Sequence, residues 1–431
     1  MQIEALYEIF LQHPVISTDT RSIKKDSLFF ALKGDNFNGN AFAAQALANG
    51  AKYVVVDEEH MAVDDRYIYV NDVLTALQDL ARFHRQQLNI PVVGITGTNG
   101  KTTSKELLYA VLSQRYKTFA TQGNLNNHIG VPLTLLAIDS SIEIAIIEMG
   151  ANHVGEIALL ARIAQPTCGL ITNVGKAHLE GFGSFDGVKR AKGELYDYLQ
   201  DHKGTLFLQG DNPYLIEMFN QRSINKVLRY GFSEDNDIIG SLLIADPYLS
   251  ISWHQKDSAT AYTVRTNLTG SYNIENFLAA IAVGLFFDID PERINKGIAA
   301  YIPQNNRSQI THTSRNTVVA DFYNANASSM AAALDNIRVL TADHKVVVLG
   351  DMFEMGDEAF IEHQRIIELA TTIPLDRLIF VGREFFKQRS EKAEFYETTD
   401  DALIQLKDIN NAFILLKASR GMAFEKILEI L

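Results

Sequence analysis

The chain is predicted to fold as an α/β protein with three domains: a small N-terminal domain, a doubly wound central domain and a Rossmann-like C-terminal domain. Its 431 residues are about three times the length of a typical domain. Apolar strand-like segments alternate with helical ones, which is typical of sheets covered by helices on both faces. The texture of the sequence changes at Ile90 and again near 303–309, so the predicted domains are 1–88, 89–305 and 306–431.

The N-terminal range is predicted to mix short strands with helices. SLFFALKG (27–34) and AKYVVVDEE (51–59) are predicted strands. The segment between them, 40–51, and the segment 75–89 are predicted helices.

The two larger ranges each predict a sheet of mostly parallel strands, because their strand segments are continuously apolar rather than alternating. In the central range the predicted strands are 90–96, 143–150, 168–175 and 205–210, with helices at 101–115 and 273–287 and shorter polar strands within 228–268. In the C-terminal range they are 317–323, 345–351, 378–382 and 413–419, with helices at 328–340 and 358–372.

Composition excludes several classes of protein. A formal charge of −13 argues against a nucleic acid or an anionic membrane as the main partner. The one cysteine, Cys168, rules out an intrachain disulfide and fits a reducing cytoplasm. Glu4 and Glu8 stand where a signal peptide carries positive charge. The longest apolar run, 277–287, is too short for a bilayer, which needs about 20 residues. We therefore expect a cytoplasmic protein without membrane insertion.

The stretch PVVGITGTNGKTT has the features of a phosphate-binding loop. An apolar strand precedes it, Gly97 and Gly100 permit a tight turn, and a helix begins near Lys101. The general pattern G-x-x-x-x-G-K-[ST] requires a glycine where Ile95 stands, so the turn is a variant. Lys101 is predicted to bind the β- and γ-phosphates and Thr102 to hold Mg²⁺. The alternative is an ordinary glycine-rich turn between a strand and a helix.

Three more side chains of the central range are candidates. Glu148 ends a predicted strand, where α/β sheets place metal ligands, although a solvated strand end is the alternative. His178 follows the next strand, and a lone histidine is more often structural. Lys192 lies beside Lys189 and Arg190, whose charges favour a solvated helix face.

Several stretches resemble the Mur ligase family of peptidoglycan synthesis. GTNGKT is similar to the loop that these ligases share with folylpolyglutamate synthases. The other stretches resemble the MurF type, which joins D-alanyl-D-alanine to UDP-N-acetylmuramoyl-tripeptide, and they cover nearly the whole chain. They are TDTRSIKKDSLFFALKGDNFNG, TQGNLNNHIGVPLTLL, EMGANHVGEI, TNVGKAHLEGFGS, AKGELY, DFYNANASSM, VLGDMFEMG and LLKASRGM.

The resemblance implies a site for ATP and two Mg²⁺ ions, with Lys192 carbamylated by CO₂. Carbamylation needs an unprotonated amine, so the pKa of that lysine must be lowered. The implied catalytic residues are Lys101, His178 and Lys192, and the implied metal ligands are Thr102, Glu148, His178 and Lys192. The implied ATP-binding residues are Gly97, Thr98, Asn99, Gly100, Lys101, Thr102, Thr103, Asn276, Arg307 and Asp321. Of the two asparagines in GSYNIENF, Asn276 matches the family's adenine contact better than Asn273, although an asparagine at a helix start is commonly an N-cap.

The resemblance also implies substrate-binding residues, namely Thr20, Arg21, Lys33, Asn126, Asn127, Tyr323, Asn324 and Asn326. The implied activity is an ATP-dependent, ADP-forming ligation of UDP-N-acetylmuramoyl-tripeptide to D-alanyl-D-alanine through an acyl phosphate, by a monomer. Two alternatives stay open. One is a related ligase for another Mur step or for folate glutamylation. The other is a non-enzymatic ATP-binding regulator, which the full set of candidate residues argues against.

Overall fold

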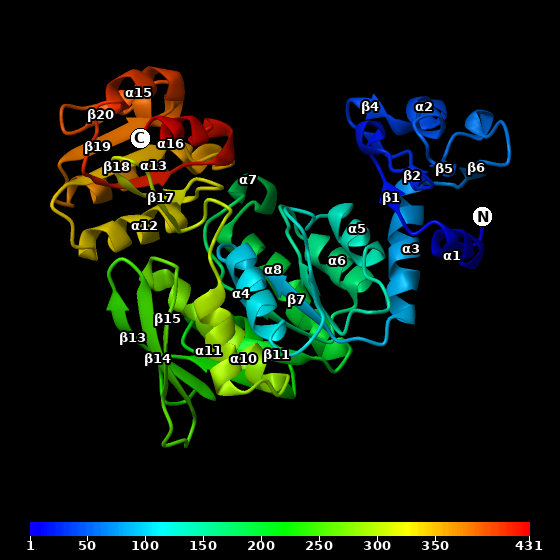
Figure 1. Ribbon diagram of the computed structural model, residues 1–431, viewed down its shortest axis with the longest axis horizontal. Coiled ribbons are helices and arrows are strands. Elements are labelled where there is room, and N and C mark those ends of the chain that lie inside the picture. The colour runs from blue at the N-terminus through cyan, green and yellow to red at the C-terminus, as the bar shows by residue number, and fades with distance from the viewer.

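The structure, a computed structural model, describes residues 1–431 with the exception of the side chain of Leu179. The α/β class is confirmed, and three larger sheets follow one another along the chain, each with its own helices, beside one two-stranded hairpin in the N-terminal part (Figure 1). The central sheet lies between the other two, with the N-terminal part on one side and the C-terminal part on the other. The domain limits at 88/89 and 305/306 stay predictions.

The N-terminal part is a parallel sheet of order β1-β2-β5-β6 with a small β3-β4 hairpin. Its strands are β1 (Ile16–Ser17), β2 (Leu28–Phe30), β3 (Lys33–Gly34), β4 (Phe37–Asn38), β5 (Tyr53–Val56) and β6 (Tyr67–Tyr69). Its helices are α1 (Ile3–Gln12), α2 (Ala43–Ala48) and α3 (Val73–Gln87), with short 3₁₀ turns η1 (Thr20–Ser22), η2 (Gly39–Phe42) and η3 (Glu59–Met61).

The predicted strand 27–34 is wrong as a single strand. Its first half is buried in the sheet, whereas Lys33 and Gly34 are exposed and pair with Phe37 and Asn38 in the hairpin. The chain therefore leaves the sheet where its residues stop being apolar.

The central sheet has the order β15-β14-β13-β12-β11-β10-β7-β9-β8, parallel from β8 to β13 and antiparallel beyond. The strands are β7 (Val92–Thr96), β8 (Thr118–Ala120), β9 (Ile144–Glu148), β10 (Cys168–Ile171), β11 (Thr205–Gln209), β12 (Lys226–Gly231), β13 (Ile238–Ala245), β14 (Leu249–Gln255) and β15 (Tyr262–Arg265). The helices are α4 (Lys101–Leu112), α5 (Gly130–Leu136), α6 (Glu156–Ala164), α7 (Leu179–Phe182), α8 (Phe185–Asp201), α9 (Pro213–Asn220), η4 (Ser271–Asn273), α10 (Ile274–Phe286) and α11 (Pro291–Ala300).

The C-terminal sheet has the order β16-β17-β21-β18-β19-β20, in which only β16 is antiparallel to its neighbour. The strands are β16 (Gln309–His312), β17 (Thr317–Asp321), β18 (Lys345–Gly350), β19 (Arg377–Val381), β20 (Glu394–Tyr396) and β21 (Phe413–Lys417). The helices are α12 (Ala327–Val339), η5 (Gly356–Glu358), α13 (Ala359–Thr371), α14 (Arg383–Phe386), α15 (Thr399–Leu406), η6 (Arg420–Met422) and α16 (Glu425–Ile430).

The topology of the central sheet determines where a site can form. The chain runs from β7 through α4 to the edge strand β8 and returns to β9, so β7 lies between β9 and β10. Ligands of open α/β sheets bind beyond the carboxyl ends of strands at such a change of direction. The loops after β7, β9 and β10 all end at this edge. None of the helices that the structure describes combines the length and apolar character needed to cross a membrane.

Candidate active site

The loop between β7 and α4 turns tightly at two glycines. Gly97 has φ +145° and Gly100 has φ +78°, values that residues with side chains rarely adopt. A Cβ at Gly97 would lie 2.0 Å from Oγ1 of Thr172, and one at Gly100 would lie 2.7 Å from Oδ1 of Asn276. Ile95 is fully buried in β7, so the variant spacing reflects a strand residue followed by a shorter turn.

Lys101 is the first residue of α4, and its ammonium donates to the carbonyl oxygens of Gly97 (2.8 Å) and Thr98 (2.9 Å). Part of the side chain stays accessible, but the surrounding protein desolvates the ammonium and lowers its pKa to about 8. The charge of Glu148 opposes this shift, and that of Arg307 adds to it. Lys101 thus holds its charge over the turn that is shaped to receive phosphates.

Glu148 lies at the end of β9, opposite Ile95 of β7 in the register of the sheet. Its Oε1 accepts a hydrogen bond from the Asn126 amide (2.8 Å) and faces the Thr102 hydroxyl (3.4 Å). Its Oε2 is buried and has no partner among the described residues. Oxygen donors of this kind fit a hard divalent cation, so Glu148 and Thr102 are suited to hold Mg²⁺. Within the described residues no three His, Cys, Asp or Glu side chains gather as a metal site.

Lys192 is buried, which corrects the reading of its segment as a solvated helix face. Its side chain lies on the inner side of α8, with the ammonium 5.3 Å from the Phe182 ring and 3.5 Å from the Ala151 carbonyl oxygen. Burial, assisted by the charge of Lys101, lowers its pKa to about 7, while Glu156 and Glu194 oppose the shift. The lowered pKa favours the unprotonated, nucleophilic form of this amine more than in an exposed lysine.

His178 lies in the loop after β10 and faces the C-terminal sheet. Its Nδ1 pairs with the Glu354 carboxylate, which precedes η5. Burial lowers the pKa of His178, with Lys101 and Lys192 acting in the same direction and Glu354 against it. The neighbouring Lys176 bridges to Glu358 and Glu362 in the same way.

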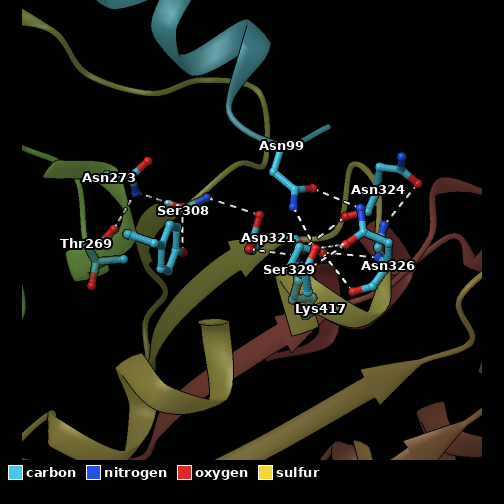
Figure 2. Close-up of polar contacts among 12 residues, drawn as sticks. Asn99, Thr269, Asn273, Ser308, Asp321, Asn324, Asn326, Ser329 and Lys417 are labelled. Atoms are coloured by element: carbon cyan, nitrogen blue, oxygen red, sulfur yellow. Dashed lines mark hydrogen bonds and ion pairs between the residues drawn. The ribbon is translucent and has the colours of Figure 1, made fainter. Parts of the chain in front are cut away.

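The C-terminal sheet contributes a second polar group, drawn in Figure 2. Asp321 ends β17, and its carboxylate accepts from the buried Lys417 ammonium (2.8 Å) and from the Ser308 backbone N–H (3.3 Å). The Arg307 guanidinium stacks 3.9 Å above the Tyr323 ring. Its Nε is buried without a partner among the described atoms, so this cation still has a donor to offer.

Asn276 is already committed within the protein. Its Oδ1 accepts from the Ser104 hydroxyl (2.9 Å), and its Nδ2 donates to Oδ1 of Asn273 (2.9 Å). Asn273 in turn donates to the Thr269 carbonyl oxygen and the Ser308 hydroxyl. Asn276 thus joins α4 to Asn273 beside the turn at Gly100, and its contact with adenine stays a prediction.

One cavity of about 740 Å³ brings most of the predicted residues together. It is lined by Gly97, Thr98, Asn99, Gly100, Lys101, Thr102, Thr103, Asn126, Asn127, Glu148, His178, Lys192, Asn276, Arg307, Asp321, Tyr323, Asn324 and Asn326. Thr20, Arg21 and Lys33 lie outside this lining, in the N-terminal part. Arg21 is paired with Asp19 (2.7 Å) and Lys33 with Asp57 (2.8 Å).

Several of the predicted substrate-binding residues already form hydrogen bonds within the protein. Asn126 holds Glu148, and Oδ1 of Asn127 accepts from two backbone N–H groups at the start of α5. Asn324 binds the backbone of the next residue, and Asn326 is the N-cap of α12. Their contacts with substrate stay predictions.

The sequence analysis missed two residues. Lys417 pairs with Asp321, and their strands place them directly opposite each other. A lone lysine at the carboxyl end of the apolar run FILLK, next to a strand ending in aspartate, was the available signal. Glu354 was also not predicted, because nothing in the sequence of its exposed loop indicates an ion pair with His178.

Comparison with known proteins gives the family. Models of the Mur ligase family match residues 14–85 (Mur ligase family, catalytic domain), 95–284 (Mur ligase middle domain) and 306–420 (Mur ligase, glutamate ligase domain). The chain belongs to the Mur ligase family.

Its relatives are of the MurF type, as the resemblance implied. The UDP-N-acetylmuramoyl-tripeptide–D-alanyl-D-alanine ligase of Bacillus subtilis (strain 168) is 34% identical, with 98% of this chain and 94% of that protein covered. A crystal structure of MurF from Acinetobacter baumannii superposes with a TM-score of 0.87 at 31% identity and covers 96% and 92% of the two chains. MurF from Thermotoga maritima in complex with ADP gives 0.86 at 26% identity and covers 96% of each. The predicted three-domain architecture and the predicted enzyme class, an ATP-dependent ligase, are confirmed.

Proposed function

We propose that this Mur ligase joins UDP-N-acetylmuramoyl-tripeptide to D-alanyl-D-alanine, with ATP converted to ADP and phosphate, in peptidoglycan synthesis. The names of its relatives support the substrates. The observation that carries the chemistry is the convergence of a phosphate loop, the unpartnered Oε2 of Glu148 and the low-pKa amine of Lys192 on one cavity. Such a site can bind a nucleotide and hold a reacting carboxylate beside it.

In the proposed reaction a carboxylate oxygen of the tripeptide attacks the γ-phosphorus of ATP, and the bond to the β-γ bridging oxygen breaks. ADP leaves, and the peptide carries an acyl phosphate. The amine of D-alanyl-D-alanine then adds to the acyl carbon, loses a proton, and expels phosphate from the tetrahedral adduct. Lys101 would stabilise the charge on the transferred phosphoryl group. When bound, Mg²⁺ would neutralise charge between the phosphates and the attacking carboxylate.

The residues of this chain would set the geometry. Thr102 would hold one Mg²⁺, and Glu148, His178 and a carbamate on Lys192 would hold the second. Carbamylation forms a bond between Nζ and the carbon of CO₂ and releases one proton, which leaves an anionic oxygen ligand in place of an ammonium. Arg307 and Asp321 would contact ATP from the C-terminal side, so that both sheets contribute to one nucleotide site. Thr20, Arg21 and Lys33 would bind the UDP-sugar end, and Arg21 and Lys33 would first give up their present acidic partners.

The test is a phosphate-release assay with the defined UDP-muramoyl-tripeptide and a panel of amine donors. We expect release with D-alanyl-D-alanine and at most background with D-alanine, L-alanyl-L-alanine or glutamate. Release with a single amino acid or glutamate would establish one of the other ligase steps instead. Binding of ATP without release of phosphate, whichever amine donor is added, would favour the alternative of a non-enzymatic ATP-binding regulator.

The carbamate has a separate test. Lys192→Ala should lose most of the activity, on the order of 10²-fold or more, because a metal ligand is lost. Added short carboxylates should restore part of it by supplying the missing oxygens. Full activity of Lys192→Ala would show that the carbamate assignment is wrong. Lys189→Ala, three residues earlier on α8 and paired with Asp186 and Glu217, is the control and should stay active.

The cellular setting is likewise a proposal. One buried cysteine fits a cytoplasmic location, and a formal charge of −13 argues against a nucleic-acid partner; the monomeric state is an expectation from the resemblance alone.

A further inference from the structure

A ring of hydrogen bonds joins the phosphate loop to the C-terminal part of the chain (Figure 2). The Asn326 amide donates to Oδ1 of Asn99 (2.8 Å), and the Asn99 amide donates to the Ser328 hydroxyl (2.9 Å). The Ser328 hydroxyl closes the ring by donating to Oδ1 of Asn326 (2.9 Å). Two of the three bonds cross from the central sheet's loop to the start of α12.

The orientation of this ring is fixed by the helix. Oδ1 of Asn326 also accepts from the backbone N–H of Ser329, as an N-cap does (2.9 Å). Because Oδ1 of Asn326 accepts from Ser329, the amide N–H₂ of Asn326 is the group that faces Asn99. Asn99 must therefore direct its Oδ1 towards that N–H₂ group. An amide flip of Asn99 would therefore set two N–H₂ groups against each other and break the bond to Asn326, whereas the Ser328 hydroxyl can turn to donate to the flipped oxygen.

On the central side, the backbone of Asn99 is held firmly. Its N–H donates to Oδ1 of Asn173 (2.9 Å), and its carbonyl oxygen accepts from Thr172 (2.6 Å) and Asn173 (3.2 Å). The Thr98 hydroxyl and the Lys101 ammonium bond back to the central part of the chain. Among the described hydrogen bonds of the loop, only those of the Asn99 side chain reach the C-terminal part.

On the C-terminal side, the ring lies next to the groups proposed to complete the ATP site. Asn326 follows Asp321 by five residues and Tyr323 by three. Asp321 is tied to Lys417, and Tyr323 carries the stacked Arg307 guanidinium. Moving the start of α12 away from the loop would therefore also move the segment that carries these contacts.

We propose that Asn99 is a positioning residue that links the shape of the phosphate loop to the seating of the C-terminal domain. With the domain seated, the ring holds the loop in its present turn; with the domain displaced, the Asn99 side chain loses both partners. Binding of a nucleoside triphosphate and seating of the domain then favour each other, since coupling of two equilibria is reciprocal. The inference rests on the proposed function only in taking the loop to bind nucleotide.

The helix does not need this ring. The capping box of α12 is formed by Asn326 and Ser329 within the C-terminal part. Asn99→Ala therefore removes both crossing bonds and Ser328→Ala removes one of them, and each variant leaves the cap in place. Ser329→Ala is the matched control, because it also replaces a serine by alanine, at the next residue. It removes the Ser329 part of the capping box but no crossing bond.

The first measurement is the affinity for a non-hydrolysable ATP analogue with Mg²⁺, determined by calorimetry. We expect Ser328→Ala and Asn99→Ala each to bind about 5- to 20-fold more weakly, and the double variant to bind no worse than the weaker single variant. Ser329→Ala should bind like the parent. Additive losses in the double variant, or normal binding by Ser328→Ala, would overturn the proposal.

The second measurement is amide hydrogen exchange without nucleotide. Both variants should exchange faster than the parent in 97–103 and in 326–332, whereas Ser329→Ala should exchange faster in α12 alone. Unchanged exchange of the loop in Ser328→Ala would contradict the link even if the protein bound no nucleotide. A protein that binds the ATP analogue and shows the expected exchange changes in the variants, yet joins no amine donor to the tripeptide, would refute the proposed function but support the role of Asn99.

Discussion

The central domain meets the N-terminal part of the chain through a buried apolar core and the C-terminal part through polar side chains. One cluster of buried apolar residues continues from Leu6 and Leu77 to Leu135 and Leu160, across the first boundary. The clusters on the two faces of the C-terminal sheet contain, among the described residues, only side chains of that sheet's own domain. The first boundary resembles the interior of one domain, and the second resembles a transient interface.

Polar contacts cross both boundaries. At the first boundary, the buried Arg85 of α3 donates hydrogen bonds to the carbonyl oxygens of Ala164 (3.0 Å) and Gln165 (3.1 Å), at the end of α6. At the second, the partly exposed Lys176 bridges the partly exposed Glu358 and the buried Glu362, which also keeps Arg365 as a partner. Exposed ion pairs stabilise by about 0–1 kcal/mol, whereas buried unpaired carbonyls cost about 1–3 kcal/mol each. The second boundary also has a buried hydrogen bond, from Asn336 to Thr269 (3.1 Å), so it is the apolar core crossing only the first boundary that indicates a more firmly fixed N-terminal part.

The largest effect should come from Arg85→Ala, which breaks the fixed boundary. Two carbonyl oxygens at the end of α6 would lose a charged donor in a buried place, so we expect a loss of about 2–4 kcal/mol in the free energy of unfolding. Urea titration, with hydrogen exchange of α3 to locate the change, measures it. Arg82→Ala, one turn earlier and exposed, should change stability by less than about 0.5 kcal/mol. Similar losses of unfolding free energy in Arg85→Ala and Arg82→Ala would show that the buried contacts of Arg85 do not fix the N-terminal boundary.

An intermediate effect should come from pH. His84, also on α3, is buried and accepts from the Tyr7 hydroxyl while its Nε2 meets the Ile138 carbonyl oxygen (2.8 Å). Burial lowers its pKa, and the bond to Ile138 opposes the shift. The unfolded chain therefore takes up the proton first, so this stability is complete above about pH 6.5 and is lost as pH falls through the folded pKa.

Hydrogen exchange of α3 measured from pH 8 to pH 5 tests this expectation. Exchange, corrected for its intrinsic pH dependence, should rise at the acidic end in the parent. His84→Gln, which cannot titrate, should show a flatter profile. Identical profiles would show that His84 does not control the boundary.

The smallest effect on stability should come from Lys176→Ala at the C-terminal boundary. We expect a change of about 0–1 kcal/mol in the free energy of unfolding, which shrinks further in high salt. Exchange of η5 and the first turn of α13 should nevertheless increase, because their tie to the central domain is lost. Lys189→Ala, whose ion pairs lie within the central domain, is the control. A loss above about 2 kcal/mol would show that this boundary is part of the folded core.

The same contrast explains what the sequence could predict. The strand, turn and helix from Val92 to Leu112 follow from a continuous apolar run, two glycines and a helical pattern, which are local signals. The short edge strands β16 and β20 were not predicted, because segments of three or four half-buried residues carry little periodicity.

Site residues divide in a similar way. Glu148 was predictable from its place at a strand end, whereas the burial of Lys192 arises from packing of α8 and α7 around it. No local pattern separates Lys192 from the half-buried Lys189. The pairings of Asn99 with Asn326 and of His178 with Glu354 depend on how two domains meet, which local sequence does not encode.

The most direct test of the central claim, that one boundary is fixed and the other opens, is fluorescence energy transfer across each of them. Cysteines replacing the exposed Asp65, Asp201 and Asp408 provide one pair per boundary, and the buried Cys168 stays unlabelled. On addition of the tripeptide nucleotide and a non-hydrolysable ATP analogue, we predict a change in transfer between 201 and 408 and none between 65 and 201. A change across the N-terminal boundary, or no change across the C-terminal one, would contradict the account.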